Sequence, residues 1–142
     1  MSPRLVVSVR GALVDGRARA AFQGAIHDIL EDLTQKGEER LDEMLRPRPA
    51  GVFLGVGQAR KGQLSTGHYR RNVHRTVGAL HVRIDDGGVI YGPWLEGVST
   101  RNQTTRFKGY FSFRRTSQWL QSQVKGVVQK WVGRDVRRAN GL

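Results

Sequence analysis

The residues in this sequence that are best suited to catalysis or metal binding are its histidines. The chain has four, and three follow one another at intervals of six and seven residues: His68, His74 and His81. Zinc-binding histidines on one helix face stand at positions i and i+4 beside a glutamate, so this spacing matches no such signature. Carboxylate partners for acid–base chemistry would have to come from Asp85, Asp86 or Glu96. Because Asp85 and Asp86 precede two glycines, turn formation is their more usual role.

The other common reactive groups are absent or incomplete. Without cysteine, the chain cannot form a disulfide framework, a thiolate nucleophile or a zinc site built on sulfur. Gly55 and Gly57 with Lys61-Gly62 resemble a phosphate-binding loop, but the Gly-Lys-Ser/Thr ending is missing. We predict that the protein is not an enzyme and has no catalytic residue, metal ligand or cofactor. A basic nuclease that uses a histidine is the last of our three hypotheses.

Basic and aromatic residues interleave in the stretch from Arg101 to Arg115. Sites for single-stranded nucleic acid combine cationic grooves with stacking rings in this way. The alternative is that Phe111 and Phe113 begin the core side of a helix while the cations are solvated. Binding of nucleic acid is therefore our second hypothesis, and the cations that would face DNA or an acidic partner are Arg101, Arg106, Lys108, Arg114 and Arg115.

Two tryptophans, Trp94 and Trp119, do not follow the apolar pattern of the chain. Tryptophan is costly to leave in water, and it is enriched at the energetic centres of protein interfaces. The alternative is local packing beneath the long loops. For Trp119, which lies off the apolar stripe of a highly charged helix, we favour an interface.

Apolar periodicity predicts the elements that position these residues. Residues 4–9 form a β-branched run that Gly11 ends, which predicts a strand at a sheet edge. Residues 17–46 have helical spacing of apolar side chains, with an acidic opposite face: Asp28, Glu31, Asp32, Glu38, Glu39, Asp42 and Glu43. Such a helix spans ~45 Å, so we expect it to break near Thr34–Gly37 or to project beyond the body. Pro47 would end it.

The glycine-rich sequence after this helix predicts a long loop over residues 51–64. A short helical turn through Tyr69–Val73 would follow it. Ser65 or Thr66 would cap that turn. Residues 77–84 alternate with one slip, which predicts a strand with a bulge.

The signals that follow predict a hairpin and a second long helix. Asp85-Asp86-Gly87-Gly88 favours a tight turn, and residues 89–91 would return as the partner strand. Pro93 would open a one-turn helix. Residues 97–108 form a second long, basic loop, and a helix with one apolar stripe runs from about Tyr110. The fold class is therefore α+β: a small antiparallel sheet with a long N-terminal helix and a long C-terminal helix.

Length and charge limit the organisation further. The 142 residues suggest a single domain spanning 1–142. The net charge is +12, but residues 1–50 carry eight basic and eight acidic residues, so the excess belongs to residues 51–142. A basic chain indicates a nucleic-acid or acidic protein partner. No apolar run is long enough for a membrane span, and the amino terminus does not read as a signal peptide. We expect a soluble protein made in a cytoplasm, with no membrane partner.

Three segments resemble the tail-completion or neck proteins of tailed bacteriophages. Residues 65–73 (STGHYRRNV) are similar to the family's Thr-Gly-x-Leu-Arg-x-Ser-Ile stretch, and residues 89–97 (VIYGPWLEG) to its Tyr-Ala-x-Tyr-Val-Glu-x-Gly. Arg106-Phe107 resembles the Arg-Pro-Phe that leads into the family's C-terminal helix. Ser65 replaces the usual Asp, no aromatic separates Glu96 from Gly97, and the proline is missing after Arg106. With the amphipathic N-terminal helix, the resemblance covers most of residues 15–140.

The resemblance implies a virion structural protein, which is our first hypothesis. Such proteins form rings, usually hexameric, between the head connector and the tail tube, and they are assembled in the host cytoplasm. The implied partners are further copies of the chain, head-connector and tail-tube proteins, and DNA in the channel. The implied subunit contacts are Thr66, Gly67, Tyr91, Trp94, Glu96 and Trp119. From charge segregation we add the hypothesis that the acidic face of residues 28–43 pairs with the basic half of an adjacent copy.

Overall fold

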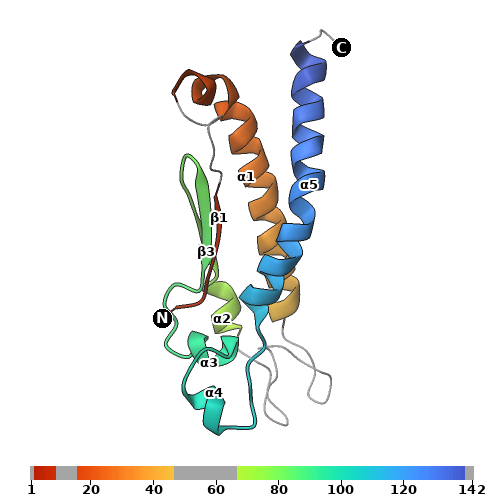
Figure 1. Cartoon of the computed structure of the whole chain (residues 1–142). Helices are drawn as coiled ribbons and strands as arrows, with labels where there is room; N and C mark the ends of the chain where they lie inside the picture. Colours follow the sequence, from red (N-terminus) through yellow and green to blue (C-terminus); the bar gives the residue numbers. More distant parts are fainter. Residues whose placement is uncertain (1, 9–15, 47–66, 140–142) are drawn as a thin grey trace.

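The computed structural model describes residues 2–8, 16–46 and 67–139. The elements in chain order are β1 (Arg4–Ser8), α1 (Gly16–Leu45), α2 (His68–Arg71), β2 (His74–Val77), β3 (His81–Asp85), α3 (Gly92–Glu96), α4 (Arg101–Thr104) and α5 (Ser112–Ala139). The two long helices lie against one face of a narrow sheet, and the three short helices gather at one end of the molecule (Figure 1). The α+β prediction is confirmed.

The sheet has three antiparallel strands in the order β1-β3-β2. Register places Leu5 opposite Ile84 and Val7 opposite Val82, so these apolar side chains face the helices. Successive residues of a strand point to opposite faces, and Arg4, Val6 and Ser8 accordingly lie exposed on the other side. The prediction of an edge strand at the amino terminus is confirmed.

The strand predictions for residues 77–91 are wrong in two places. The apparent bulged strand over 77–84 is the end of β2, a turn at residues 78–80 and the start of β3. Gly78 N–H donates to the His81 carbonyl at 2.7 Å, which closes this turn. Residues 89–91 form no strand. The glycines after Asp86 turn the chain toward α3 instead, and β3 pairs with β1 and β2.

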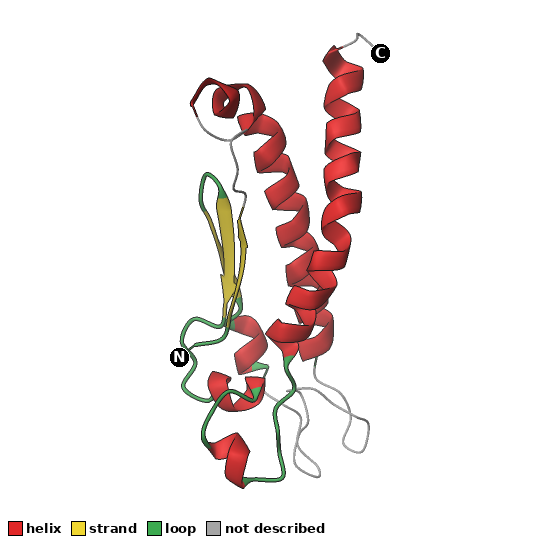
Figure 2. Cartoon of the chain, viewed as in Figure 1, coloured by secondary structure: helices red, strands yellow, loops and turns green. Residues whose placement is uncertain are grey.

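The long helices agree with the helical periodicity. α1 has 30 residues and runs through Thr34–Gly37 without a break, and α5 has 28. The two helices are close beside the sheet and diverge toward the C-terminal end of α5 (Figure 2). Gly37 marks their close approach, because a Cβ there would lie 3.1 Å from side-chain carbons of both Ile84 and Leu120.

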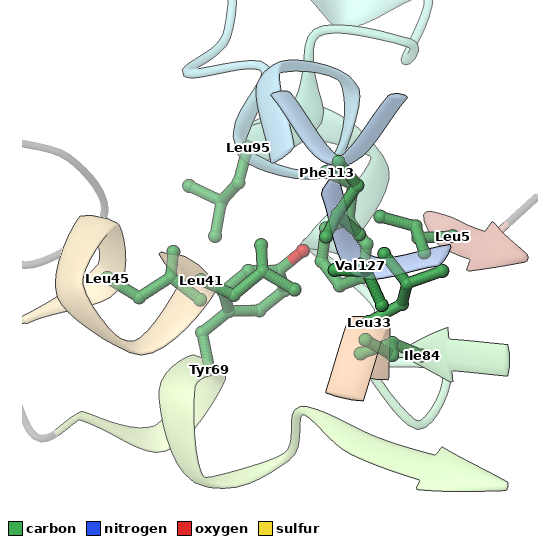
Figure 3. Close-up of a cluster of buried hydrophobic side chains, with 10 residues drawn as sticks. Leu5, Leu33, Leu41, Leu45, Tyr69, Ile84, Leu95, Phe113 and Val127 are labelled. Carbon is green, nitrogen blue, oxygen red and sulfur yellow. The ribbon is translucent and has the colours of Figure 1, made fainter. Parts of the chain in front are cut away.

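The hydrophobic core lies where α1, α5, the sheet and α3 meet. Its main cluster joins all four parts of the fold and is drawn in Figure 3; the buried residues are Leu5, Leu33, Leu41, Leu45, Tyr69, Ile84, Leu95, Phe113, Leu120 and Val127. A smaller cluster of Ile26, Leu30 and Val82 packs the first half of α1 against the sheet. The two clusters lie along the contact of α1 with the sheet, and the domain boundaries of 1–142 stay a prediction.

The two predicted long loops have different outcomes. Residues 51–64 lie outside the described residues, as do Ser65 and Thr66. Gly67, with φ +68°, occupies the N-cap position of α2 and provides no side-chain cap. The segment 97–108 is partly folded, because α4 occupies its middle. The one-turn helix predicted at Pro93 is confirmed as α3, with the proline in its first turn.

Gly126 offers a test of the α5 assignment. It lies inside the helix, and a Cβ at this position would meet nothing within 4 Å. Alanine loses less backbone entropy than glycine on forming a helix, so Gly126→Ala should raise the free energy of unfolding by about 0.5–1 kcal/mol. Urea denaturation followed by circular dichroism measures this change. A decrease in stability would contradict a regular helix at this position.

Candidate functional site

The segments that carry the family resemblance meet at the lower end of the molecule in Figure 1. We call this region the α3 hub and define it by five buried residues from three segments of the chain: Tyr69, Asp86, Gly92, Leu95 and Glu96. α3 follows the turn after β3 and packs against α2 and the beginning of α5. The Leu95 carbonyl accepts a 2.7 Å hydrogen bond from the Tyr110 N–H, which ties α3 to the segment before α5.

Glu96 connects α3 to α5 through a buried carboxylate. Its side chain is 5% exposed, and its two oxygens accept the backbone N–H groups of Phe113 at 2.9 Å and Arg114 at 3.3 Å. These are donors that the first turn of a helix leaves without partners. Burial raises the pKa of Glu96, although the backbone donors oppose this rise. Glu96 therefore caps α5 from a distance of 17 residues along the chain.

Asp86 is the most buried acid of the α3 hub, with 0% exposure. Its Oδ1 accepts the Gly88 N–H at 3.1 Å. Its Oδ2 and the Tyr69 hydroxyl both lie buried without a hydrogen bond of normal geometry. Burial raises the pKa of both side chains, and for Asp86 the neighbouring Asp85 charge raises it further. The α3 hub thus contains an acid that burial biases toward its neutral form.

Gly92 allows α3 to approach this acid. A Cβ at Gly92 would lie 1.8 Å from Asp86 Oδ2 and 3.3 Å from the Tyr69 ring. Both distances are shorter than ordinary van der Waals contact, so no side chain fits here. Packing of α3 against Asp86 and Tyr69 therefore requires a glycine at position 92.

An aromatic cluster supports α3 on its other side. The rings of Trp94 and Phe107 are 4.6 Å apart, and those of Phe107 and Tyr110 are 4.7 Å apart. Asn102 holds the loop together, because its amide donates to the carbonyls of Trp94 at 2.9 Å and Phe107 at 3.2 Å. The rings pack on one another, which agrees with core packing rather than a surface for stacked bases.

The predicted contact residues fall in several environments. Tyr91 is 41% exposed and lies beside His68 and Tyr69, with ring centroids 6.2 and 6.0 Å apart. Trp94 and Trp119 are half-buried, and Trp119 lies under the Arg40 guanidinium at 5.5 Å. Trp119 of α5 therefore packs partly against α1, and its role in a subunit interface stays a prediction. Thr66 lies outside the described residues.

The predicted cations are largely involved in local contacts. Arg101 lies over the Trp94 ring at 5.3 Å, and Arg114 over Phe111 at 5.7 Å. The Lys108 ammonium donates to the Asn102 carbonyl at 2.9 Å. All five predicted cations, Arg106 and Arg115 included, are exposed. These cations stabilise the loop around α4 and the start of α5, in addition to any contact with a partner.

The acidic face of α1 pairs extensively within the chain. Arg75 of β2 lies 3.3 Å from Glu31 and 3.4 Å from Glu38, and Arg70 of α2 pairs with Asp42 and lowers the pKa of that carboxyl. Internal partners thus account for much of the charge that suggested pairing between copies. Charge reversal here would disrupt the fold as well as any interface, so it does not test assembly alone.

Asp32 connects the two long helices. It accepts hydrogen bonds from the Lys130 ammonium at 2.7 Å and the Trp131 indole N–H at 3.1 Å. Burial raises the pKa of Asp32, but these hydrogen bonds outweigh that effect and hold it below its usual value. The basic end of α5 is therefore attached to α1 by this carboxylate.

The structure shows one histidine beside a carboxylate. His74 Nε2 lies 3.1 Å from Asp85 Oδ1. Within the described ranges, no group of three or more histidine and acidic side chains could hold a metal ion. None of the helices in the same ranges is both long enough and apolar enough to cross a membrane.

Sequence reasoning missed the roles of Tyr69 and Asp86 in the α3 hub and the cap made by Glu96. The only available signal was the Asp-Asp-Gly-Gly sequence, which indicated a turn but not which carboxylate would be buried. Comparisons with protein-family models, with curated proteins and with solved structures give no match for this chain.

Proposed function

We propose that this chain is the subunit of a homo-oligomeric ring at the head–tail junction of a tailed bacteriophage, where the ring joins or completes the tail and DNA passes through it. The resemblance in three segments supplies the class of protein. Those segments contribute α2, α3 and the approach to α5. The first two meet at the Tyr69 and Tyr91 rings, and the third contacts α3 through the Trp94 and Phe107 rings. A set of short motifs that forms one packed unit supports a shared origin more strongly than scattered similarity would.

The exposed apolar residues beside the α3 hub carry the assembly part of this proposal. Ile90 is 97% exposed, Val98 is 64% exposed and Tyr91 is 41% exposed. Ile90 and Tyr91 directly precede α3, and Val98 follows its C-cap, where the Val98 N–H donates to the Pro93 carbonyl at 2.9 Å. These exposed apolar side chains thus flank α3, which the buried residues of the α3 hub hold in place. Exposed apolar groups of this kind mark protein–protein contacts.

A ring requires that one surface of each copy binds a different surface of the next. The segments that flank α3 supply one such surface, because they carry the exposed Ile90, Tyr91 and Val98 and α3 lies at one end of an elongated molecule (Figure 2). The long α5, which diverges from α1 toward its C-terminal end (Figure 2), is a candidate for the complementary surface. Its exposed Val124 and Val132 are apolar positions on an otherwise basic helix.

The experiment measures assembly of the purified chain with and without its main apolar contact. We expect native mass spectrometry and negative-stain electron microscopy to show rings, with a hexamer at six times the 15.9 kDa chain mass. Ile90→Asp should abolish them, because a charge cannot be buried unpaired in an interface. Since Ile90 is almost fully exposed, the variant should keep the circular dichroism spectrum and unfolding midpoint of the wild type.

Thr104→Asp is the matched control, because it places the same charge on an exposed residue of α4. It should leave the rings intact. A wild-type chain that remains monomeric throughout the micromolar range, both alone and with purified phage tails, would contradict the proposal. If the Ile90→Asp variant forms rings as stable as those of the wild type, the subunit contact does not involve the apolar residues beside the α3 hub.

A further inference from the structure

The face of the sheet that points away from α1 and α5 has basic side chains around a hollow. No described helix covers this face (Figure 2). Register places Arg4 of β1 and His74 of β2 on either side of Asp85 of β3. Arg83 stands two residues before Asp85 and therefore faces the same side. The open hollow of about 460 Å³ between them is lined by Ser2, Arg4, His74, Arg83, Asp85, Gly87 and Gly88.

Asp85 organises the basic groups of this hollow. Its carboxylate is mostly buried, with Oδ1 3.1 Å from His74 Nε2 and Oδ2 2.8 Å from Arg83 Nε. The Gly87 N–H also donates to Oδ1 at 2.9 Å. Both oxygens are thus already engaged from within the chain. The carboxylate thus pairs with His74 and with the Nε of Arg83, and both of these side chains line the hollow.

Arg4 supplies a cation that no acid of the described residues pairs with. It is exposed and stands across from Asp85, whose ion pairs go to His74 and Arg83 instead. His74 has its Nδ1 2.9 Å from the Asn72 carbonyl. Both ring nitrogens of His74 thus lie beside oxygen atoms of the chain. The hollow is therefore lined by two guanidinium groups, one imidazole and a single carboxylate.

We propose that this hollow is a binding site for a phosphoryl group. Arginine guanidinium groups donate pairs of hydrogen bonds that match phosphate oxygens, which makes them the preferred side chains for such a ligand. The Ser2 hydroxyl lies near Gly88 at the rim and adds a neutral donor. The phosphoryl group belongs either to the backbone of a nucleic acid or to a free phosphate. The inference stands on the sheet alone and does not depend on ring formation.

The first test is a nuclear magnetic resonance titration of the full chain with inorganic phosphate, with chloride at matched ionic strength as the control. We expect saturable shifts of the Gly87 and Gly88 amides and of the Arg83 Nε–H with phosphate only. A short DNA duplex that moves the same resonances at lower concentration identifies the nucleic-acid backbone as the source. Shifts with phosphate but not with the duplex identify a free anion. Shifts absent from these three groups, or spread evenly over all basic segments, would overturn the proposal.

The second test separates the site from the general charge of the protein. Arg4→Gln removes an exposed cation that pairs with no acid in the described part of the chain, so the fold should be unaffected. It should abolish the phosphate-dependent shifts and, if DNA is the ligand, reduce the slope of log affinity against log salt by about one. Lys125→Gln is the control, since it removes one exposed cation of α5 that neither lines the hollow nor belongs to the predicted DNA-facing cations. Equal effects of the two variants would show binding by net charge and refute a site at the sheet.

Discussion

Replacing Gly92 by alanine should lower the free energy of unfolding by about 3 kcal/mol or more. The new Cβ would lie 1.8 Å from Asp86 Oδ2, so either α3 or the aspartate must move. Overpacking of this kind costs about 1–3 kcal/mol. Displacing Asp86 also breaks its bond to Gly88 and leaves a buried carboxylate without compensation, which adds to that cost. Urea denaturation of the purified variant measures the change.

A double-mutant cycle tests whether Asp86 is the cause. Asp86→Ala removes the side chain that the new Cβ would meet, so Gly92→Ala should cost much less in an Asp86→Ala background than in the wild type. Gly24→Ala is the matched control, because nothing lies within 4 Å of a Cβ there, and it should be neutral or stabilising. If Gly92→Ala costs the same in both backgrounds, the close contact between α3 and Asp86 is wrong.

Apolar periodicity predicted the long elements correctly because each of them repeats one pattern over many residues. The first strand and both long helices lie close to their predicted bounds. The fold class follows from their order along the chain. Of the two alternatives for α1, a break near Thr34–Gly37 or a projecting helix, the break does not occur, and Gly37 lies against Ile84 and Leu120. Tertiary packing there stabilises a residue that is a poor helix former on its own.

The short strands could not be assigned in the same way. Residues 77–84 show a slip in their alternation, which is compatible with a bulge or with a tight turn, and only pairing between strands decides between them. The glycines after Asp85 and Asp86 also allow more than one turn. In the structure, each aspartate accepts the N–H of the second residue after it, at 2.9 and 3.1 Å. These local bonds direct the chain into α3 rather than into a returning strand.

The α3 hub was even less accessible to sequence reasoning. Glu96 and the N–H groups that it caps are 17 and 18 residues apart, and no local pattern encodes a contact of that length. Asp86 is buried because Tyr69 of α2 and Gly92 of α3, which belong to separate segments of the chain, both pack against it. The resemblance identified Tyr91, Trp94 and Glu96 as important, but their roles differ, because only Tyr91 of the three is exposed.

The protein should be more stable in mild acid than at neutral or alkaline pH. Burial raises the pKa of Asp86 and of Glu96 in the fold, so the folded state binds these protons more tightly than the unfolded state. Stability then increases as pH falls through the folded pKa values, down to the unfolded values of about 4. Each group contributes a slope of up to about 1.4 kcal/mol per pH unit within its window.

Asp32 and Asp42 act in the opposite direction. Their pKa values are lowered in the fold, so their contribution is present above pH about 4 and is lost as the pH falls below it. The two effects place the maximum of stability in mild acid, near the unfolded pKa values of the carboxyl groups. Urea midpoints measured between about pH 3 and 9 would show a rise on acidification followed by a fall.

Asp86→Asn should remove part of the increase in stability on mild acidification. It should leave the loss of stability below about pH 4 unchanged. The asparagine oxygen can still accept the Gly88 N–H, while the buried negative charge is eliminated, so the variant should gain most relative to wild type at high pH. Glu39→Gln, an exposed change on α1 next to its Gln35 partner, is the matched control and should follow the wild-type profile. A wild-type stability that increases steadily from pH 5 to 9, or an Asp86→Asn profile parallel to that of the wild type, would show that Asp86 is charged and well solvated in the fold.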